Sequence, residues 1–180
     1  VQMNGVWALC DTDGKMLTDP VYESIGSFTG DYATVVKNGK YGVINYMANT
    51  NGMTMMDMVS YDRKHNEDNH EDNRDGTDHN YSWNCGEEGP TRKKRIRDLR
   101  KQQLCNGFLL LFLSQGTPLL LAGDEFGNSQ EGNNNAYCQD NRISWLDWRL
   151  LETNRDIFEF VKGLIAFRKK HGVFHMEREP

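Results

Sequence analysis

Apolar and polar positions alternate in two different styles along the chain. From Val6 to Asn45 the apolar residues come in short runs separated by turn-forming residues, which is typical of antiparallel strands. Three runs predict strands, namely Val6–Cys10, Tyr32–Val36 and Tyr41–Ile44. Turn signals at residues 12–15 and 37–40 separate them. Residues 1–46 therefore predict a small antiparallel β-hairpin meander.

The same segment repeats itself. The stretches that begin at Asn4 and at Asn38 share an Asn-Gly turn, an aromatic residue, a small residue and an aliphatic residue, with an offset of 34 residues. A fixed internal period of this size indicates a repeat unit. The pattern resembles the WG-type β-repeat, with one unit and the start of a second present. Because repeat units bury their faces against neighbours, we expect further packing partners for this segment.

Beyond residue 90 the apolar period changes to that of a helix. Apolar side chains recur every three or four residues from Ile96 to Phe112, and the run 114–118 ends this helix with Gly and Pro. Its last turns, Phe108 to Leu113, are apolar on all sides, so we expect that end to be buried. A second helix is predicted from Asn154 to His171. The side chains expected on its inner face are Ile157, Val161, Leu164, Ile165 and Phe167.

A continuously apolar run, Leu119–Ala122, lies between the two helices and ends in Gly123-Asp124-Glu125. Such a run predicts a parallel strand buried on both faces that delivers carboxylates to the edge of a sheet. Adjacent strand residues point in opposite directions, so Asp124 and Glu125 cannot form an acid/base pair with each other. We expect them to have a structural or substrate-orienting role rather than a catalytic one. The order helix, buried strand, polar loop, helix is that of an α/β barrel.

Two long polar stretches, Tyr61–Gly89 and Phe126–Trp148, remain outside these elements. The first contains aromatic residues, which favours an ordered active-site loop, and the alternative is a solvated linker. The second combines amides in 132–141 with Trp145 and Trp148. Amides and aromatic rings suit neutral sugars, which present hydroxyl groups and apolar C–H faces. In the alternative, Asn and Gly serve left-handed turns and both tryptophans are core residues.

Composition and charge exclude several classes of function. The chain has 180 residues and a formal net charge of −5, so it lacks the basic excess of a nucleic-acid-binding protein. The most apolar stretch, Leu104–Ala122, is interrupted by polar residues and predicts no membrane span. No secretory signal is visible at residues 1–4. With four isolated cysteines, this predicts a cytoplasmic protein with reduced thiols. The cysteines are Cys10, Cys85, Cys105 and Cys138.

No metal or cofactor site is expected. His65, His70 and His79 lie among acidic residues, but their spacing matches no transition-metal template. A calcium site around Asp68, Asp72 and Asp75 is the alternative, although the EF-hand pattern is missing.

Several longer strings resemble bacterial glycogen debranching enzymes of the isoamylase type, in the α-amylase superfamily. The matching strings are 57–61, 64–67, 73–77, 82–86, 88–91, 114–118, 122–127, 132–141 and 144–145. The resemblance covers residues 47–180, which leaves 1–46 as the repeat segment. It implies a (β/α)₈ barrel that hydrolyses α-1,6-glucosidic branch points with retention, and it assigns this part to strand seven, helix seven, strand eight and helix eight. The expected fold class is α+β, a meander followed by an incomplete (β/α)₈ barrel.

The resemblance also assigns roles to residues. In the family, strand seven ends in His-Asp-Gly, where the Asp stabilises the transition state and the His binds sugar; here the positions hold Thr50, Asn51 and Gly52. An amide at residue 51 lacks the charge that favours an oxocarbenium-like transition state. The nucleophile and general acid of the family lie on strands four and five, which find no match here, so no catalytic residue is intact. The candidate substrate-binding residues are Thr50, Asn51, Asp124, Glu125, Asn135, Tyr137 and Trp145.

Three hypotheses about function follow. In the first, the chain derives from an α-1,6-debranching enzyme of glycogen or related α-glucans and is inactive alone, unless a second copy or a complementing barrel fragment supplies the missing strands. In the second, it is a noncatalytic module for glucan binding or protein interaction. In the third, it is a truncated or fused fragment without function.

Overall fold

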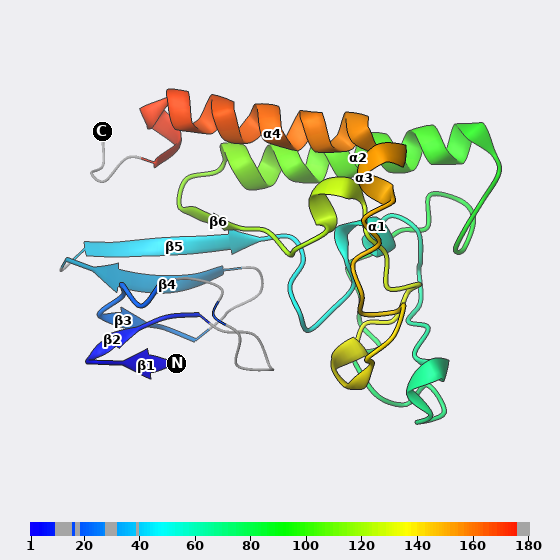
Figure 1. The fold of residues 1–180 in the computed structure, drawn as a ribbon, viewed down its shortest axis with the longest axis horizontal. Helices are drawn as coiled ribbons and strands as arrows, with labels where there is room; N and C mark the ends of the chain where they lie inside the picture. The colour runs from blue at the N-terminus through cyan, green and yellow to red at the C-terminus, as the bar shows by residue number, and fades with distance from the viewer. Residues whose placement is uncertain (10–15, 17–18, 28–31, 39, 176–180) are drawn as a thin grey trace.

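The computed structural model describes residues 1–9, 16, 19–27, 32–38 and 40–175. A small β sheet lies on one side, two long helices run side by side in the same direction along it, and loops form the remainder (Figure 1). The long helices are α2 (Lys94–Leu113) and α4 (Arg155–Lys170). Two short helices, α1 (Met55–Met58) and α3 (Leu150–Thr153), precede them in the chain. The fold is thus mixed α+β.

Five short strands form the N-terminal part, where the sequence pattern predicts three. These are β1 (Gln2–Met3), β2 (Val6–Trp7), β3 (Ser24–Ile25), β4 (Tyr32–Lys37) and β5 (Lys40–Tyr46), so β1 and β3 are additional to the prediction. β1 and β2 pair antiparallel around Asn4 and Gly5, whose positive φ values of 51° and 85° suit a two-residue hairpin turn. Asn38 takes a φ of 54° in the β4–β5 hairpin. The predicted turn at 12–15 and the predicted strand residue Cys10 lie outside the described residues.

The sheet continues from the repeat segment into the α/β part. Its order is β3-β4-β5-β6, with β6 spanning Thr117–Leu119. β4 pairs antiparallel with β5, whereas β6 pairs parallel with β5, with Ile44 opposite Thr117. A parallel pair needs a crossover connection, which here contains α1 and α2. Strand β5 therefore belongs to both the antiparallel meander and the parallel unit (Figure 1).

The predicted strand at 119–122 is shifted and is not buried on both faces. The observed strand ends at Leu119. The next two residues, Leu120 and Leu121, are half-buried, and Ala122 is exposed. Among the described residues β6 has a strand neighbour on one side only, so the apolar run is not enclosed within the sheet. Asp124 and Glu125 consequently lie on a short 3₁₀ helix, Asp124–Phe126, and not at the end of a strand.

The helices pack mainly through one shared core. Phe108, Leu104 and Val161 are almost completely buried between α2 and α4. The expectation that all residues near the end of α2 are buried is wrong, because Leu109 and Leu110 face away from α4 and are 36% and 65% exposed. Phe167, expected on the inner face of α4, is likewise 46% exposed. These apolar side chains of the two helices therefore remain partly in contact with water.

Arg168 fills the inner position next to Phe167 and joins the two helices. Its guanidinium donates hydrogen bonds to the backbone oxygens of Phe112 and Ser114 at 2.7 Å each, and to that of Gly116. The last carbonyls of a helix lack intrahelical partners, so this side chain caps α2 from the neighbouring helix. Among the described residues, no helix has both the length and the apolar character that crossing a membrane requires.

Candidate functional site

The two polar loops pack against each other through buried asparagines. Asn66, Asn133 and Asn134 are each at most 3% exposed. The Asn66 amide donates to Asn134 Oδ1 at 2.9 Å, and its own oxygen accepts the Asn134 backbone N–H at 3.0 Å. Asn133 donates to Asn69 Oδ1 at 2.8 Å. The first loop, 61–89, is therefore an ordered element held by the second loop, and not a solvated linker.

Asn135, a candidate substrate ligand, takes part in the same loop contact. Its amide donates to Asp75 Oδ2 at 2.8 Å, and Asn69 donates to the same oxygen at 2.7 Å. Burial opposes ionisation of Asp75, but the hydrogen bonds from Asn69 and Asn135 outweigh it and lower the pKa of this carboxyl. Within the described ranges, no three His, Cys, Asp or Glu side chains form a group that could hold a metal ion.

Arg100 anchors the first loop to helix α2. The residue is only 7% exposed. Its guanidinium donates to the backbone oxygens of Gly89 at 2.6 Å and Asn84 at 3.0 Å, and also to that of Glu87. Glu88 contributes from the loop itself, since its carboxylate accepts the backbone N–H groups of Asp62 and Arg63. Although its burial acts against ionisation, these bonds lower the pKa of Glu88 to about 2.

Asp57 anchors the second loop to helix α1. Its buried carboxylate accepts the Ser129 hydroxyl at 2.5 Å and the Gln130 backbone N–H at 2.7 Å. Burial raises the pKa of Asp57, and these hydrogen bonds offset part of that rise. Asp57, Glu88 and Arg100 were not among the predicted site residues. For Asp57 and Glu88 the only signal was their place in strings shared with debranching enzymes.

The carboxylates of Asp124 and Glu125 point toward the protein itself. Asp124 is 1% exposed, and its Oδ1 accepts the backbone N–H of Met55 at 2.9 Å, at the start of α1. Its Oδ2 has no hydrogen-bond partner among the described residues. Glu125 accepts the backbone N–H of Gly123 at 2.9 Å. In this structure both carboxylates therefore hold loop amides.

The candidates after β5 lie in a turn. Thr50 is half-buried and Asn51 is exposed, and the backbone N–H of Asn51 donates to Asn49 Oδ1 at 2.7 Å. An exposed amide at residue 51 can donate or accept a hydrogen bond to a ligand, but it carries no charge.

Aromatic candidates on the second loop point to solvent. Tyr137 is 65% exposed and Trp145 is 59% exposed, with the Trp145 indole N–H donating to Asp140 Oδ1 at 2.9 Å. Trp148 is 64% exposed and packs on Phe126 with ring centroids 5.4 Å apart. The alternative in which both tryptophans are core residues is therefore wrong.

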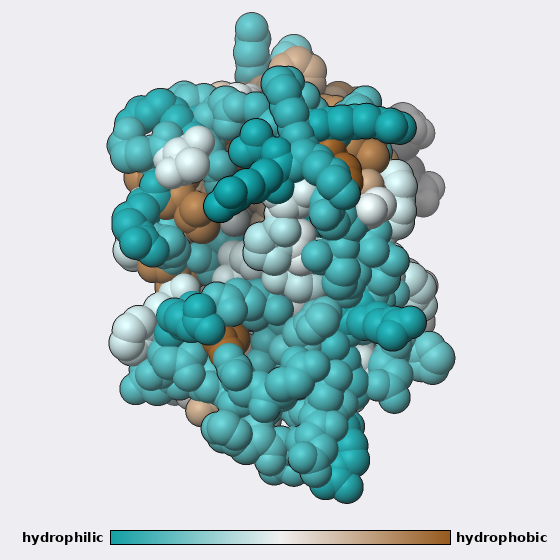
Figure 2. Space-filling view, turned by 90° about the vertical axis from the view of Figure 1, so that its right-hand side faces the viewer, coloured by the Kyte–Doolittle hydropathy of each residue, from teal (hydrophilic) through white to brown (hydrophobic). Residues whose placement is uncertain are grey.

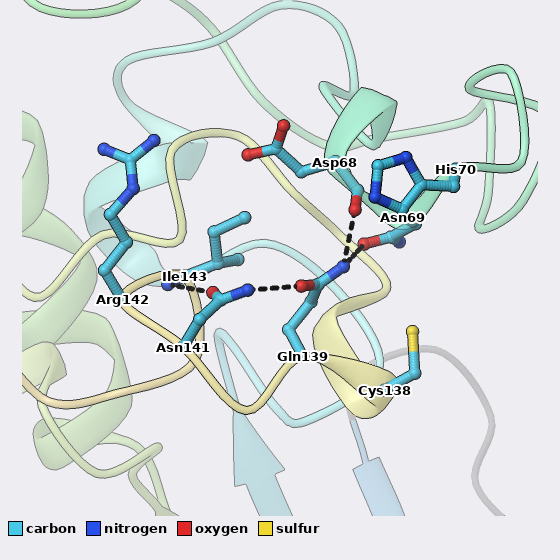
Figure 3. Close-up of a pocket in the computed structure, with 8 residues that line it drawn as sticks. All are labelled: Asp68, Asn69, His70, Cys138, Gln139, Asn141, Arg142 and Ile143. Atoms are coloured by element: carbon cyan, nitrogen blue, oxygen red, sulfur yellow. Dashed lines mark hydrogen bonds between the residues drawn. The ribbon is translucent and has the colours of Figure 1, made fainter.

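A pocket of about 530 Å³ is lined by residues 68–70 of the first loop and by residues of the second loop between positions 138 and 143 (Figure 3). Gln139 crosses its wall, donating to Asp68 O at 2.9 Å and accepting from the Asn141 amide at 2.6 Å. Arg142 and His70 line opposite sides (Figure 3). Asp68 is the only carboxylate among the lining residues, whereas retaining hydrolysis of a glycoside needs two about 5 Å apart. The lining of the pocket thus consists mainly of polar side chains.

Asp124 gives the fold a defined pH dependence. Burial raises its pKa well above the ordinary value of 3.8, so the folded state holds the proton more tightly than the unfolded chain. Its contribution to stability is then complete below pH 3.8 and is lost as pH rises toward the folded pKa, by up to about 1.4 kcal/mol per pH unit. We expect Asp124→Asn to remove this pH-dependent loss, because an amide does not ionise. The variant keeps the hydrogen bond, since the amide oxygen still accepts the backbone N–H of Met55.

Urea unfolding of both proteins at several values between pH 4 and pH 8 measures this effect. The difference in unfolding free energy between Asp124→Asn and the unsubstituted chain should grow in favour of the variant as pH rises. Asp98→Asn is the control, because Asp98 has a 61% exposed side chain on α2. A difference that stays constant with pH would show that Asp124 is ionised alike in both states.

Comparison with known proteins identifies relatives of the larger part of the chain. It is 49% identical over 135 residues to the "Glycogen operon protein GlgX homolog" of Mycobacterium tuberculosis, a match that covers 75% of this chain and 19% of the relative. A protein of the same name from Haemophilus influenzae is 43% identical, over 84% of this chain and 24% of its own length. "Isoamylase 1, chloroplastic" of Oryza sativa is 43% identical, over 71% and 16%.

Solved structures show the same fold for most of the chain. Pullulanase from Bacillus acidopullulyticus matches with a TM-score of 0.52 and 21% identity, over 74% of this chain and 13% of that one. The chain spans only about a fifth of the length of the curated relatives it matches. At the other end, residues 7–41 match the model of the "WG containing repeat".

These matches confirm the predicted resemblance of the larger part of the chain to isoamylase-type glycogen debranching enzymes, and that of the N-terminal segment to a WG-type repeat.

Proposed function

We propose that this chain binds α-glucan, such as the outer chains of glycogen, through the face made by its two polar loops. The observation that carries the proposal is the exposure of Tyr137 and Trp145 on the second loop, which also contributes amides to a polar pocket. Sugar rings stack their apolar faces on aromatic side chains, and their hydroxyl groups pair with amides. The curated relatives named for glycogen support the same class of ligand.

We infer that the parent family hydrolyses α-1,6 branch linkages with retention of the anomeric configuration. We propose that the 180-residue chain does not carry out this hydrolysis alone. Asn51 offers no negative charge to an oxocarbenium-like transition state, and the pocket lining contains a single carboxylate. Residues 47–180 would then correspond to the end of a (β/α)₈ barrel, and residues 1–46 to the repeat unit.

The strand order favours binding without hydrolysis, as a noncatalytic module. In a closed (β/α)₈ barrel every strand has a parallel neighbour on both sides. Here β5 has parallel β6 on one side but antiparallel β4 on the other. A complementing barrel fragment, or a second copy of the chain, would have to displace β4 before it could pair with β5. The repeat hairpin thus occupies the edge through which a barrel would continue.

Titration with maltoheptaose tests the proposed binding. Each of the four tryptophans gives one indole N–H resonance, and we expect that of Trp145 to shift with sugar. Trp145→Ala should weaken binding at the loop face about tenfold, because a stacking contact of about 1.4 kcal/mol is lost. Trp7→Phe, in the repeat segment, is the matched aromatic control and should leave the affinity unchanged.

Two results would contradict the proposal. A Trp145 resonance that does not move at millimolar maltoheptaose would exclude binding at this face. Release of linear maltooligosaccharides from a branched limit dextrin, above the rate in buffer, would show that the chain hydrolyses branch points despite Asn51.

A further inference from the structure

A second groove, separate from the loop pocket, lies between helix α2 and the end of the first polar loop. Its volume is about 400 Å³, and its floor is apolar, with Met58 and Leu110 among the lining residues. None of the residues that line it lines the pocket beside Tyr137. The space-filling view shows hydrophobic side chains reaching the surface in the helical half of the molecule, whereas the half formed by the polar loops is almost uniformly hydrophilic (Figure 2).

Two exposed aromatic rings border this groove. Tyr81 is 92% exposed and Trp83 is 51% exposed. The backbone at Trp83 is held, because its N–H donates to Met58 O at 2.8 Å and the oxygen of the next residue, Asn84, accepts from Arg100 at 3.0 Å. This anchoring limits the entropy lost when a ligand stacks on the Trp83 ring.

Polar groups on the walls complete the groove. Gln103 and Asn106 contribute amides from α2, whereas the Asn80 amide of the loop already accepts from Asn134 at 2.8 Å. The Ser82 hydroxyl, also in the lining, is buried and has no hydrogen-bond partner among the described residues. A buried hydroxyl without a partner costs free energy, which a ligand oxygen would relieve. No acidic or basic side chain lines the groove, so an ionic ligand is not favoured.

We propose that this groove is a second α-glucan-binding site, in which glucosyl units stack on Tyr81 and Trp83 while their hydroxyl groups meet the amides of α2. An apolar floor, neutral amide walls and two exposed rings are the complement of a neutral pyranose, which alternates C–H faces with hydroxyl groups. The ligand class rests on the proposed function, but the site is a different one. Two sites on one molecule would let the chain hold a long or branched glucan at two points, which raises its overall affinity.

The indole N–H resonances of Trp83 and Trp145 separate the two sites in one titration with maltoheptaose. We expect the Trp83 resonance to follow its own saturation curve. Tyr81→Ala should raise the dissociation constant obtained from the Trp83 curve about tenfold and leave that from the Trp145 curve unchanged. Tyr137→Ala, which removes an exposed tyrosine from the other loop, is the matched control and should leave the Trp83 curve unchanged. Cellohexaose, with β-linkages, should shift Trp83 less than maltoheptaose does.

Each other outcome has a definite meaning. If Trp145 shifts with sugar and Trp83 does not, the second site is excluded and the loop-face proposal stands. If Trp83 shifts and Trp145 does not, the groove binds glucan and the loop-face proposal falls. If the Trp83 resonance changes with protein concentration in the absence of sugar, and sugar has no effect, the groove is covered by a second copy of the chain and the inference is overturned.

Discussion

Replacing Arg100 by Ala should lower the free energy of unfolding by about 3–5 kcal/mol, a large part of the stability of a domain of this size. The guanidinium donates to the backbone oxygens of Asn84, Glu87 and Gly89, which close the first polar loop. A hydrogen bond from a charged donor contributes about 1.5–3 kcal/mol, and a buried carbonyl left without a partner costs about 1–3 kcal/mol. Urea unfolding at pH 7 measures the loss.

The control for this substitution lies on the same helix. Arg97 is exposed, and Arg97→Ala should change stability by less than about 0.5 kcal/mol. Arg100→Lys should fall between the two, because a single ammonium nitrogen cannot reach carbonyls in three directions as the planar guanidinium does. Equal losses in Arg100→Ala and Arg97→Ala would mean that the loop does not depend on this anchor.

Periodicity predicted the long elements well, because local spacing alone determines them. The helix expected from Asn154 to His171 is observed as Arg155–Lys170, and the two Asn-Gly turns mark the hairpins β1–β2 and β4–β5. Apolar period and turn chemistry act within a few residues, so no knowledge of the rest of the fold is needed.

Burial could not be predicted in the same way, because it depends on neighbours distant in sequence. The run Leu119–Ala122 reads as an enclosed strand, but among the described residues β6 has only β5 beside it. Leu110 and Phe167 remain 65% and 46% exposed although both are apolar, whereas Arg168 is buried because it donates to three carbonyls. A sequence does not show which of these partners are present.

The candidate site was predicted by residue type and only partly by position. Asn135 was expected to meet a sugar, but its amide is engaged with Asp75, whereas Tyr137 and Trp145 are exposed as a stacking role requires. The anchors Asp57 and Arg100 escaped prediction because their partners are backbone groups or side chains of other segments. Polar residues in a long loop can serve the ligand or the loop itself, and composition does not distinguish these uses.

Replacing Asp57 by Ala should remove the anchor of the second loop and lower the free energy of unfolding by about 3–4 kcal/mol. The Ser129 hydroxyl and the Gln130 N–H would lose their acceptor at a site that is 0% exposed. The cost falls on the segment that carries Tyr137 and Trp145. We therefore expect weaker maltoheptaose binding at Trp145 as well, while the groove at Trp83, held by Arg100, keeps its affinity.

Asp57→Asn distinguishes loss of the charge from loss of the acceptor. Burial already raises the pKa of Asp57, so a neutral side chain of the same shape avoids the desolvation cost, but its amide oxygen can replace only one of the two acceptor oxygens. We expect a loss of about 1–2 kcal/mol for this variant, and less than about 0.5 kcal/mol for Asp98→Ala, whose side chain is exposed on α2. Urea unfolding gives these values, and the Trp145 resonance reports the loop. If Asp57→Ala left both unchanged, the second loop would be held by its asparagine contacts with the first loop alone.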